Sequence, residues 1–168
     1  MFADCGLCIA YDNALPGLAS LRENRCDIAH ASRRLSNSRI IRGQPWHRRA
    51  VSWLFRHGIR IAMQVPRELT DTQCGFKLYK GDVARDLYSQ CTSEGFSFDI
   101  EIILRAVAAG YRIAEFPVEW TCDVDSRLSV TRAPWPLLAE LCGLKRALAA
   151  EKNQSAGPAQ TDETSPRQ

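Results

Sequence analysis

Two polar segments place the strongest constraint on the fold of this chain. They read DTQCGFK at residues 71–77 and EGFSFDIE at residues 94–101, with a short strand and a helix predicted between them. Each segment mixes carboxylates, a glycine and aromatic side chains where a packed segment would be apolar, and this mixture is typical of a pocket wall. A second interpretation, a turn followed by a capped helix, stays open on the pattern alone.

Hydrophobic periodicity predicts helices around these segments. The clearest helix has apolar residues at positions i, i+3, i+4 and i+7 and ends in a left-handed glycine cap. These residues are Ile100, Ile103, Leu104, Val107 and Gly110. Further helices are expected after a capping Asp12 or Asn13, within residues 49–62, from Gly81, and from Pro134 to about residue 150.

Short apolar runs predict the strands. They lie at residues 1–3, which are expected to be the end of a buried strand, and at residues 27–31, 76–79 and 111–120. Pro117 in the last run indicates an edge strand or a bulge, because proline has no amide hydrogen to donate to a neighbouring strand. Residues 35–47 show no periodicity and are predicted to form a loop. His30 lies inside a strand and is interpreted as a hydrogen-bonded core histidine.

Positive charge is concentrated in one part of the sequence. The 168-residue chain has a net charge of +3, whereas the segment from Arg22 to Arg67 holds eleven arginines and two acids, a net charge of +9. Arginine suits bidentate contact with phosphate or carboxylate groups, although a codon bias toward arginine would give the same composition. No known nucleic-acid-binding motif accompanies this charge, so we expect phosphorylated small molecules and no nucleic acid as partners.

The helix within residues 49–62 is amphipathic in sequence. Its expected apolar face consists of Val51, Leu54, Phe55, Gly58, Ile59 and Ala62, and its polar face of Arg49, Ser52, Arg56 and Arg60. Trp53 stands at the border between the two faces. A basic face with a boundary tryptophan fits a helix that lies in a membrane interface. Packing on the domain with a solvated arginine face is the alternative.

Cysteine usage and hydropathy indicate the compartment. The seven cysteines are odd in number and irregularly spaced, which argues against a disulfide framework and fits a reducing cytoplasm. Cys5 and Cys8 have C-x-x-C spacing but lack the context of a redox or zinc site. The sequence has no secretory signal and no run of about 20 apolar residues, so we expect no membrane span.

The polar segments also carry a family resemblance. DTQCGFKLY, followed by EGFSFDIEIILRA and GYRIAEFPVEW, resembles the C-terminal half of family 2 glycosyltransferases, in the subgroup that transfers a sugar from a nucleotide to a polyprenyl phosphate. The resemblance runs from about residue 1 to about residue 130. It implies an α/β chain with a partial GT-A fold, a mixed sheet flanked by helices, whose N-terminal nucleotide-binding half is missing. Residues 1–150 would form this portion, and the polar residues 151–168 are expected to be a disordered tail.

The resemblance implies a function as well. The chain is expected to transfer a hexose from a nucleotide-sugar to a polyprenyl phosphate lipid, as a protein peripheral to the cytoplasmic face of the membrane. Two alternatives stay open: a non-catalytic remnant or partner subunit of such an enzyme, and a basic module that binds membrane surfaces. A polyprenyl phosphate is already an anionic nucleophile, so its site needs charge compensation and positioning more than a strong base.

Site residues follow from the resemblance position by position. Asp4 matches the first carboxylate of a metal-binding Asp-x-Asp motif, but Gly6 stands where the second belongs, so a Mg²⁺ or Mn²⁺ site is expected to be weak or lost. The donor diphosphate would contact Arg33 and Arg127. The acceptor phosphate would contact Arg48 and Arg49.

Three further residues are candidates for the catalytic pocket. Asp71, Gln73 and Glu101 would shape its sugar-binding end. The alternative role for Asp71 and Glu101 is to fix loops by accepting hydrogen bonds from backbone amides. Both roles stay open at this point.

Overall fold

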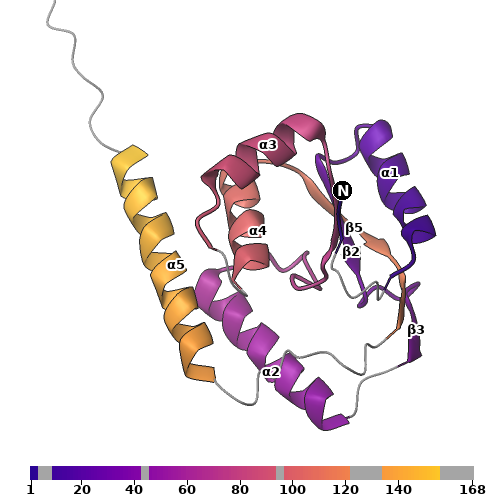
Figure 1. The fold of residues 1–168 in the computed structure, drawn as a ribbon, viewed down its shortest axis with the longest axis horizontal. Coiled ribbons are helices and arrows are strands. Elements are labelled where there is room, and N and C mark those ends of the chain that lie inside the picture. The colour runs from indigo at the N-terminus through magenta and orange to yellow at the C-terminus, as the bar shows by residue number, and fades with distance from the viewer. Residues whose placement is uncertain (4–8, 43–45, 94–96, 122–133, 156–168) are drawn as a thin grey trace, which may run out of the picture.

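A computed structural model describes residues 1–3, 9–42, 46–93, 97–121 and 134–155 of the chain. Its elements are β1 (Phe2–Ala3), the 3-10 helix η1 (Tyr11–Asn13), α1 (Ala14–Arg22), β2 (Ile28–Ser32), β3 (Arg39–Arg42), α2 (Trp46–Met63), β4 (Phe76–Tyr79), α3 (Gly81–Gln90), α4 (Phe98–Ala108), β5 (Ile113–Pro117), β6 (Glu119–Thr121) and α5 (Pro134–Ser155). The fold is mixed α/β, with helices flanking a mixed sheet (Figure 1).

The main sheet has four strands in the order β1-β4-β2-β5. Strand β4 is antiparallel to both of its neighbours, whereas β2 and β5 run parallel, with Ile28 opposite Ile113 and Ser32 opposite Pro117. Strand β5 therefore lies at an edge, as Pro117 predicted. A separate pair of parallel strands, β3 and β6, lies beyond this sheet.

Alternating side chains of the sheet build two layers of core. Helix α1 covers one face, where Ala14 and Leu18 pack with Leu78 and Phe116. Gly17 allows the close approach, because a β-carbon there would lie 2.7 Å from atoms of both Leu78 and Phe116. Helices α3 and α4 cover the other face, through a cluster of Ile28, Val83, Leu87, Ile102 and Ala106.

Helices α2 and α5 extend the structure away from the sheet. They share an apolar cluster with α4, in which Ile59 and Met63 of α2 meet Ile100 of α4 and Leu141 and Leu144 of α5. Figure 1 shows α5 running beside α2 and α4 on the side opposite α1. This cluster fixes the position of α2 relative to the sheet.

Most predicted elements are confirmed, and three local predictions are wrong. Residues 39–42 form strand β3 instead of a loop, because they pair with β6, about 80 positions further along the chain. Asn13 precedes α1, but its side chain does not cap the helix. Its Nδ2 donates to the Ala10 carbonyl oxygen, and its Oδ1 accepts from the Glu119 backbone amide. Strand β1 lies half-buried at the sheet edge, where a buried strand was predicted.

The predicted faces of α2 are also wrong. Leu54 and Ile59 were placed on one apolar face, but Leu54 is 67% exposed and Ile59 only 4% exposed. Arg56 and Arg60 lie on the side of the helix that faces the domain and are half-buried. The apolar side chains of Trp46, Leu54 and Ile61 are exposed on the other side. Arg56 and Arg60 face the domain because both line a pocket between α2 and the loop before β4.

Candidate functional site

The sheet topology brings the end of β2 next to the first polar segment. Because β4 is antiparallel to β2, the chain that enters β4 lies at the edge of the sheet where β2 ends. The residue after β2 is Arg33, and the loop before β4 contains Asp71. Both were predicted site residues, and the structure places them in direct contact.

Arg33 and Asp71 form a bidentate ion pair. The Arg33 Nε donates to Asp71 Oδ2 at 2.6 Å and its Nη2 to Oδ1 at 2.8 Å, while the Arg33 backbone amide donates to Oδ2 at 3.1 Å. The Asp71 side chain is fully buried and that of Arg33 is 23% exposed. Burial alone would raise the pKa of Asp71, but the hydrogen bonds and charge of Arg33 hold it well below its usual range.

A second carboxylate holds the loop that carries Asp71. Glu115 of β5 accepts hydrogen bonds from the backbone amides of Thr70 and Asp71 at 2.8 and 3.0 Å, and from the Thr70 hydroxyl at 2.7 Å. The guanidinium carbon of Arg33 lies 5.3 Å from the ring centre of Trp120 in β6. Glu115 therefore holds the loop that carries Asp71, while Trp120 lies close to the guanidinium group of Arg33.

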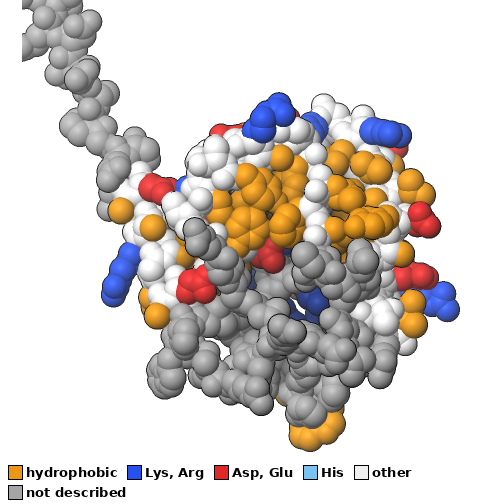
Figure 2. All heavy atoms as spheres, viewed as in Figure 1, with side chains coloured by type: hydrophobic (Ala, Val, Ile, Leu, Met, Phe, Trp, Pro, Cys, Tyr) orange, Lys and Arg blue, Asp and Glu red, His pale blue; other side chains and the backbone are white. Residues whose placement is uncertain are grey.

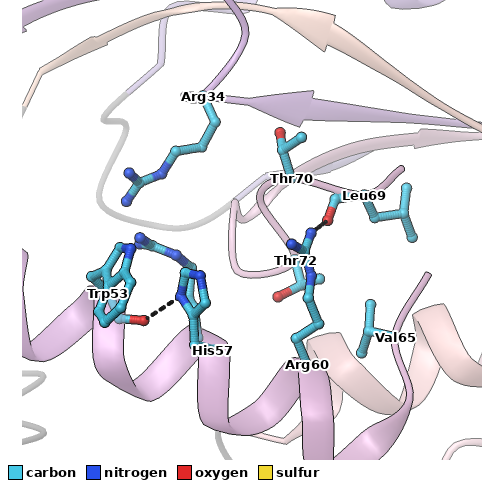
Figure 3. Close-up of a pocket in the computed structure, with 9 residues that line it drawn as sticks. Arg34, Trp53, His57, Arg60, Val65, Leu69, Thr70 and Thr72 are labelled. Atoms are coloured by element: carbon cyan, nitrogen blue, oxygen red, sulfur yellow. Dashed lines mark hydrogen bonds between the residues drawn. The ribbon is translucent and has the colours of Figure 1, made fainter. Parts of the chain in front are cut away.

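A cavity of about 270 Å³ lies beside this ion pair. Its lining residues are Arg34, Trp53, Arg56, His57, Arg60, Val65, Leu69, Thr70 and Thr72. Figure 3 shows Arg34 reaching from the end of β2 toward Trp53 and His57 of α2, with Val65 and Leu69 on the opposite side. We call this cavity the arginine pocket.

The arginine pocket is electrostatically unbalanced. Burial and the neighbouring charges of Arg33 and Arg49 lower the pKa of Arg34, although Asp71 opposes the shift. Burial and the charge of Arg34 lower the pKa of Arg56 to about 10. Among the residues that the structure describes, neither Arg34 nor Arg56 has a carboxylate within 4.0 Å.

Two other pocket residues are held by the backbone. Arg60 donates to the carbonyl oxygens of Leu69 at 2.5 Å and Arg67 at 3.3 Å, which ties α2 to the loop across the pocket. His57 Nδ1 lies 2.9 Å from the carbonyl oxygen of Trp53, and the two rings are 4.1 Å apart. These contacts give the pocket a fixed wall on each side (Figure 3).

The second polar segment serves a different loop. The fully buried carboxylate of Glu101 accepts from the backbone amides of Thr92 and Ser93 at 3.0 and 2.8 Å, and from Arg105 Nε at 2.8 Å. Burial would raise its pKa, but these bonds lower it to about 2. Arg105 in turn pairs with Glu151 of α5. The contacts match the loop-fixing role that the sequence left open as the alternative for Glu101.

Two buried polar residues in the sheet were not predicted as part of the site. Lys77 of β4 is 1% exposed; its ammonium group donates to the Cys74 carbonyl at 2.9 Å and to the Asp99 carboxylate of α4. This ion pair links the two polar segments directly. The available signal was a lysine between Phe76 and Leu78 in an otherwise apolar strand.

His30 lies beside Lys77 in the sheet register and is also buried. Its Nε2 lies 3.2 Å from the Cys74 carbonyl oxygen. Burial and the charge of Lys77 lower its pKa to about 3. The prediction of a core histidine is confirmed for its burial and for one hydrogen bond, whereas its buried Nδ1 has no partner among the described residues.

The remaining predicted site residues divide into two groups. Gln73 lies in the loop before β4, and its buried Nε2 has no hydrogen-bond partner among the described residues. Arg49 is exposed on α2. Asp4, Arg127 and the side chain of Arg48 lie outside the part of the chain that the structure describes. The described residues contain no group of three or more His, Cys, Asp or Glu side chains that could hold a metal ion.

Comparison with known proteins identifies relatives of this chain. It is 29% identical to glycosyltransferase AglD of Haloferax volcanii over 112 residues, which cover 67% of this chain and 17% of that protein. It is 37% identical to a dolichyl-phosphate beta-glucosyltransferase of Saccharomyces cerevisiae over 54 residues, 32% of this chain and 16% of that protein. A dolichyl-phosphate beta-glucosyltransferase of Dictyostelium discoideum is 36% identical over 70 residues, 40% of this chain and 21% of that protein.

Over part of its length, the chain is a homologue of family 2 polyprenyl-phosphate glycosyltransferases. The resemblance expected from its polar segments is confirmed. This glycosyltransferase homologue spans only about a fifth of the length of the curated relatives that it matches. No family model matches the sequence. Within the described part of the homologue, no helix combines the length and hydropathy needed to cross a bilayer.

Proposed function

We propose that this glycosyltransferase homologue takes part in the transfer of a hexose from a nucleotide-sugar to a polyprenyl phosphate. The observation that carries the proposal is that the DTQCGFK segment, which carries the family resemblance, contributes Thr72 to the lining of the arginine pocket. A reaction between two phosphate-bearing substrates needs fixed positive charge more than a strong base. Arg34 and Arg56 supply such charge, and Asp71 is the one described carboxylate that favours their charged forms.

The proposed roles are those that the resemblance implies. Arg33, held by Asp71, would face the donor diphosphate, with Arg127 as a second contact. Arg48 and Arg49 would approach the acceptor phosphate from α2. Gln73 would contact the sugar, because its buried amide nitrogen has no partner in the described structure. Asp4 would contribute to a weak Mg²⁺ or Mn²⁺ site, which would neutralise the departing diphosphate.

A membrane surface is part of the proposal, because the acceptor is a lipid. Support comes from the exposed apolar side chains of α2: Trp46 is 80% exposed, Leu54 67% and Ile61 78%. Ile40 and Ile41 of β3 are exposed close before α2 in the sequence. This apolar side of α2 would meet the lipid at the cytoplasmic face.

A second candidate is a partner subunit that acts only with another chain. Figure 2 shows hydrophobic side chains gathered on the face that carries β1, and Met1, Tyr11 and Leu15 are exposed. Among the residues that the structure describes, β1 pairs in the main sheet only with β4, so its other edge would be available to a further strand. An exposed apolar face beside an open strand edge favours association with a nucleotide-binding half supplied by a separate chain.

A transfer assay tests the proposed function. The purified chain is incubated with labelled UDP-glucose or GDP-mannose, Mg²⁺ or Mn²⁺, and a polyprenyl phosphate in detergent, and labelled lipid is measured. We expect labelled lipid from the wild type and a loss of at least tenfold in Arg33→Gln, with Arg85→Gln on α3 as the charge-matched control. Product that forms only after addition of a relative's N-terminal half would favour the partner subunit. No product in either mixture would refute both candidates.

A further inference from the structure

We propose that α5 is a strap, a helix that holds another segment in place, and that its Glu140 is the positioning residue for the second polar segment. The structure describes this segment, residues 94–101, from Ser97 onward. The proposal rests on the proposed function, because Lys77 links the second polar segment to the DTQCGFK segment of the candidate site. It assigns a role to a helix that lies beyond the stretch that carries the family resemblance.

The first argument is the contact that Glu140 makes at the start of α4. Its Oε1 accepts hydrogen bonds from the Ser97 backbone amide at 3.1 Å and from the Ser97 hydroxyl at 2.5 Å. Ser97 directly precedes α4, is fully buried and does not cap the helix with its own side chain. A negative charge at a helix N-terminus is favourable, because it compensates the positive end of the helix dipole. This charge comes from a residue 43 positions away in the sequence.

The second argument is that α5 is also fastened at its other end. Glu151 accepts hydrogen bonds from Arg105 Nη1 at 2.8 Å and from Arg105 Nη2 at 3.0 Å, and Arg105 lies in the last turn of α4. In the sequence of α5, the leucines of its apolar cluster with α2 and α4 lie between Glu140 and Glu151. The helix therefore lies along α4 with a carboxylate contact at each end (Figure 1).

The third argument is that the turn held by Glu140 is also tied to the first polar segment. Asp99 lies in the first turn of α4, and its carboxylate pairs with the buried ammonium group of Lys77. The same ammonium group donates to the Cys74 carbonyl oxygen of the DTQCGFK segment at 2.9 Å. The first turn of α4 is thus held both from α5 and from the first polar segment. Loosening of this turn would therefore reach the candidate site through Asp99 and Lys77.

The two carboxylates of α5 differ in what they hold. Glu140 bonds to Ser97, directly before the turn that carries Asp99, whereas Glu151 bonds to Arg105 at the far end of α4. Removal of either one takes the same charge from the same helix and one contact from the same pair of helices. A positioning role for Glu140 therefore predicts different effects for the two removals, and a role in packing alone predicts equal effects.

Amide hydrogen exchange tests the strap without the need for turnover. The amides of Ile100 and Glu101 report on the first turn of α4, because both donate to the Ser97 carbonyl oxygen rather than to Glu140. Their exchange is measured by NMR in the full chain for the wild type, Glu140→Ala and Glu151→Ala. We expect exchange at least fivefold faster in Glu140→Ala and changed less than twofold in Glu151→Ala. Equal acceleration in both variants, or none in Glu140→Ala, would overturn the proposal.

A conservative variant decides whether the hydrogen bonds to Ser97 carry the effect. Glu140→Gln retains an acceptor oxygen for the Ser97 amide and hydroxyl, so its exchange rates should lie within threefold of the wild type. Exchange as fast as in Glu140→Ala would mean that these bonds do not hold the turn, and the assigned contact would be wrong. Circular dichroism of each variant confirms that it is folded.

The transfer assay separates the strap from the proposed function. Glu140→Ala should lower kcat at least fivefold and change the KM of each substrate less than twofold, because the variant retains every proposed substrate contact. Glu151→Ala should change neither quantity. Transfer with an unchanged kcat in Glu140→Ala would support the activity and overturn the positioning role. Faster exchange in Glu140→Ala alone, without sugar transfer by the wild type, would support the strap and refute the activity.

Discussion

Two neighbouring pairs of side chains place the same residue type in opposite situations. Arg33 is paired with the buried carboxylate of Asp71 through two side-chain bonds, and its own backbone amide donates a third. Arg34, the next residue, and Arg56 of α2 share a pocket wall with no carboxylate at ion-pair distance among the described residues. The bonds of the first pair stabilise the fold, whereas Arg34 and Arg56 gain no such contribution from a carboxylate. The difference separates an arginine that a buried carboxylate holds in place from two arginines that have no carboxylate partner among the described residues.

The largest expected effect comes from removing the carboxylate of the paired site. Asp71→Asn keeps the shape of the side chain but leaves Arg33 without its counter-charge, so we expect the free energy of unfolding to fall by about 3 kcal/mol. Urea denaturation measures this change. Asp12→Asn, an exposed residue of η1, is the control and should lose less than about 0.5 kcal/mol. A loss in Asp71→Asn as small as in the control would mean that Arg33 is not structurally paired.

The pH dependence of the same variant sharpens the comparison. The pKa of Asp71 is lowered in the folded state, so its stabilising contribution is complete above its unfolded pKa of about 3.9 and decreases as the pH falls below that value. The difference in unfolding free energy between wild type and Asp71→Asn should therefore be constant from pH 7 to 5 and shrink below pH 4. Urea denaturation at each pH measures it. A difference that grows toward low pH would contradict the assigned direction.

A smaller effect is expected from the residue that holds the Asp71 loop. Glu115→Gln retains one acceptor oxygen but loses the charge that strengthens its bonds to Thr70 and Asp71, so we expect a loss of about 1 kcal/mol. Glu119→Gln removes an exposed carboxylate that pairs with Arg39 and should cost less than about 0.5 kcal/mol. If the two variants lose equal stability, Glu115 does not support the ion pair.

The sequence predicted those parts of the molecule that depend on local pattern. The stripe of Ile100 and Ile103 predicted α4, and Gly110 has the left-handed φ of 76° expected of its cap. Strand β3 was missed because its stability comes from β6, and nothing near residues 39–42 signals a partner so distant in sequence. Periodicity therefore identified elements but not pairings between remote segments.

The sequence identified several residues of the candidate site but not how these residues are arranged. Arg33 and Asp71 were both identified, yet in separate roles, because the antiparallel pairing of β2 with β4 is what joins them. The arginine side of α2 was predicted to face solvent or lipid, since a charged face is usually solvated. Arg56 and Arg60 face the domain instead, because they line the arginine pocket. Nothing in the local sequence of α2 indicates that its arginines line a cavity.

The most direct test of the central claim is the effect of one substitution at both arginine positions. The unfolding free energies of Arg33→Gln and Arg56→Gln are measured by urea denaturation at pH 7 in a chloride buffer without phosphate. We predict a loss of about 3 kcal/mol for Arg33→Gln, because it leaves Asp71 buried and unpaired, and a change within about 1 kcal/mol for Arg56→Gln. Comparable losses in the two variants would contradict the division into an arginine that is paired with a buried carboxylate and an arginine without such a partner.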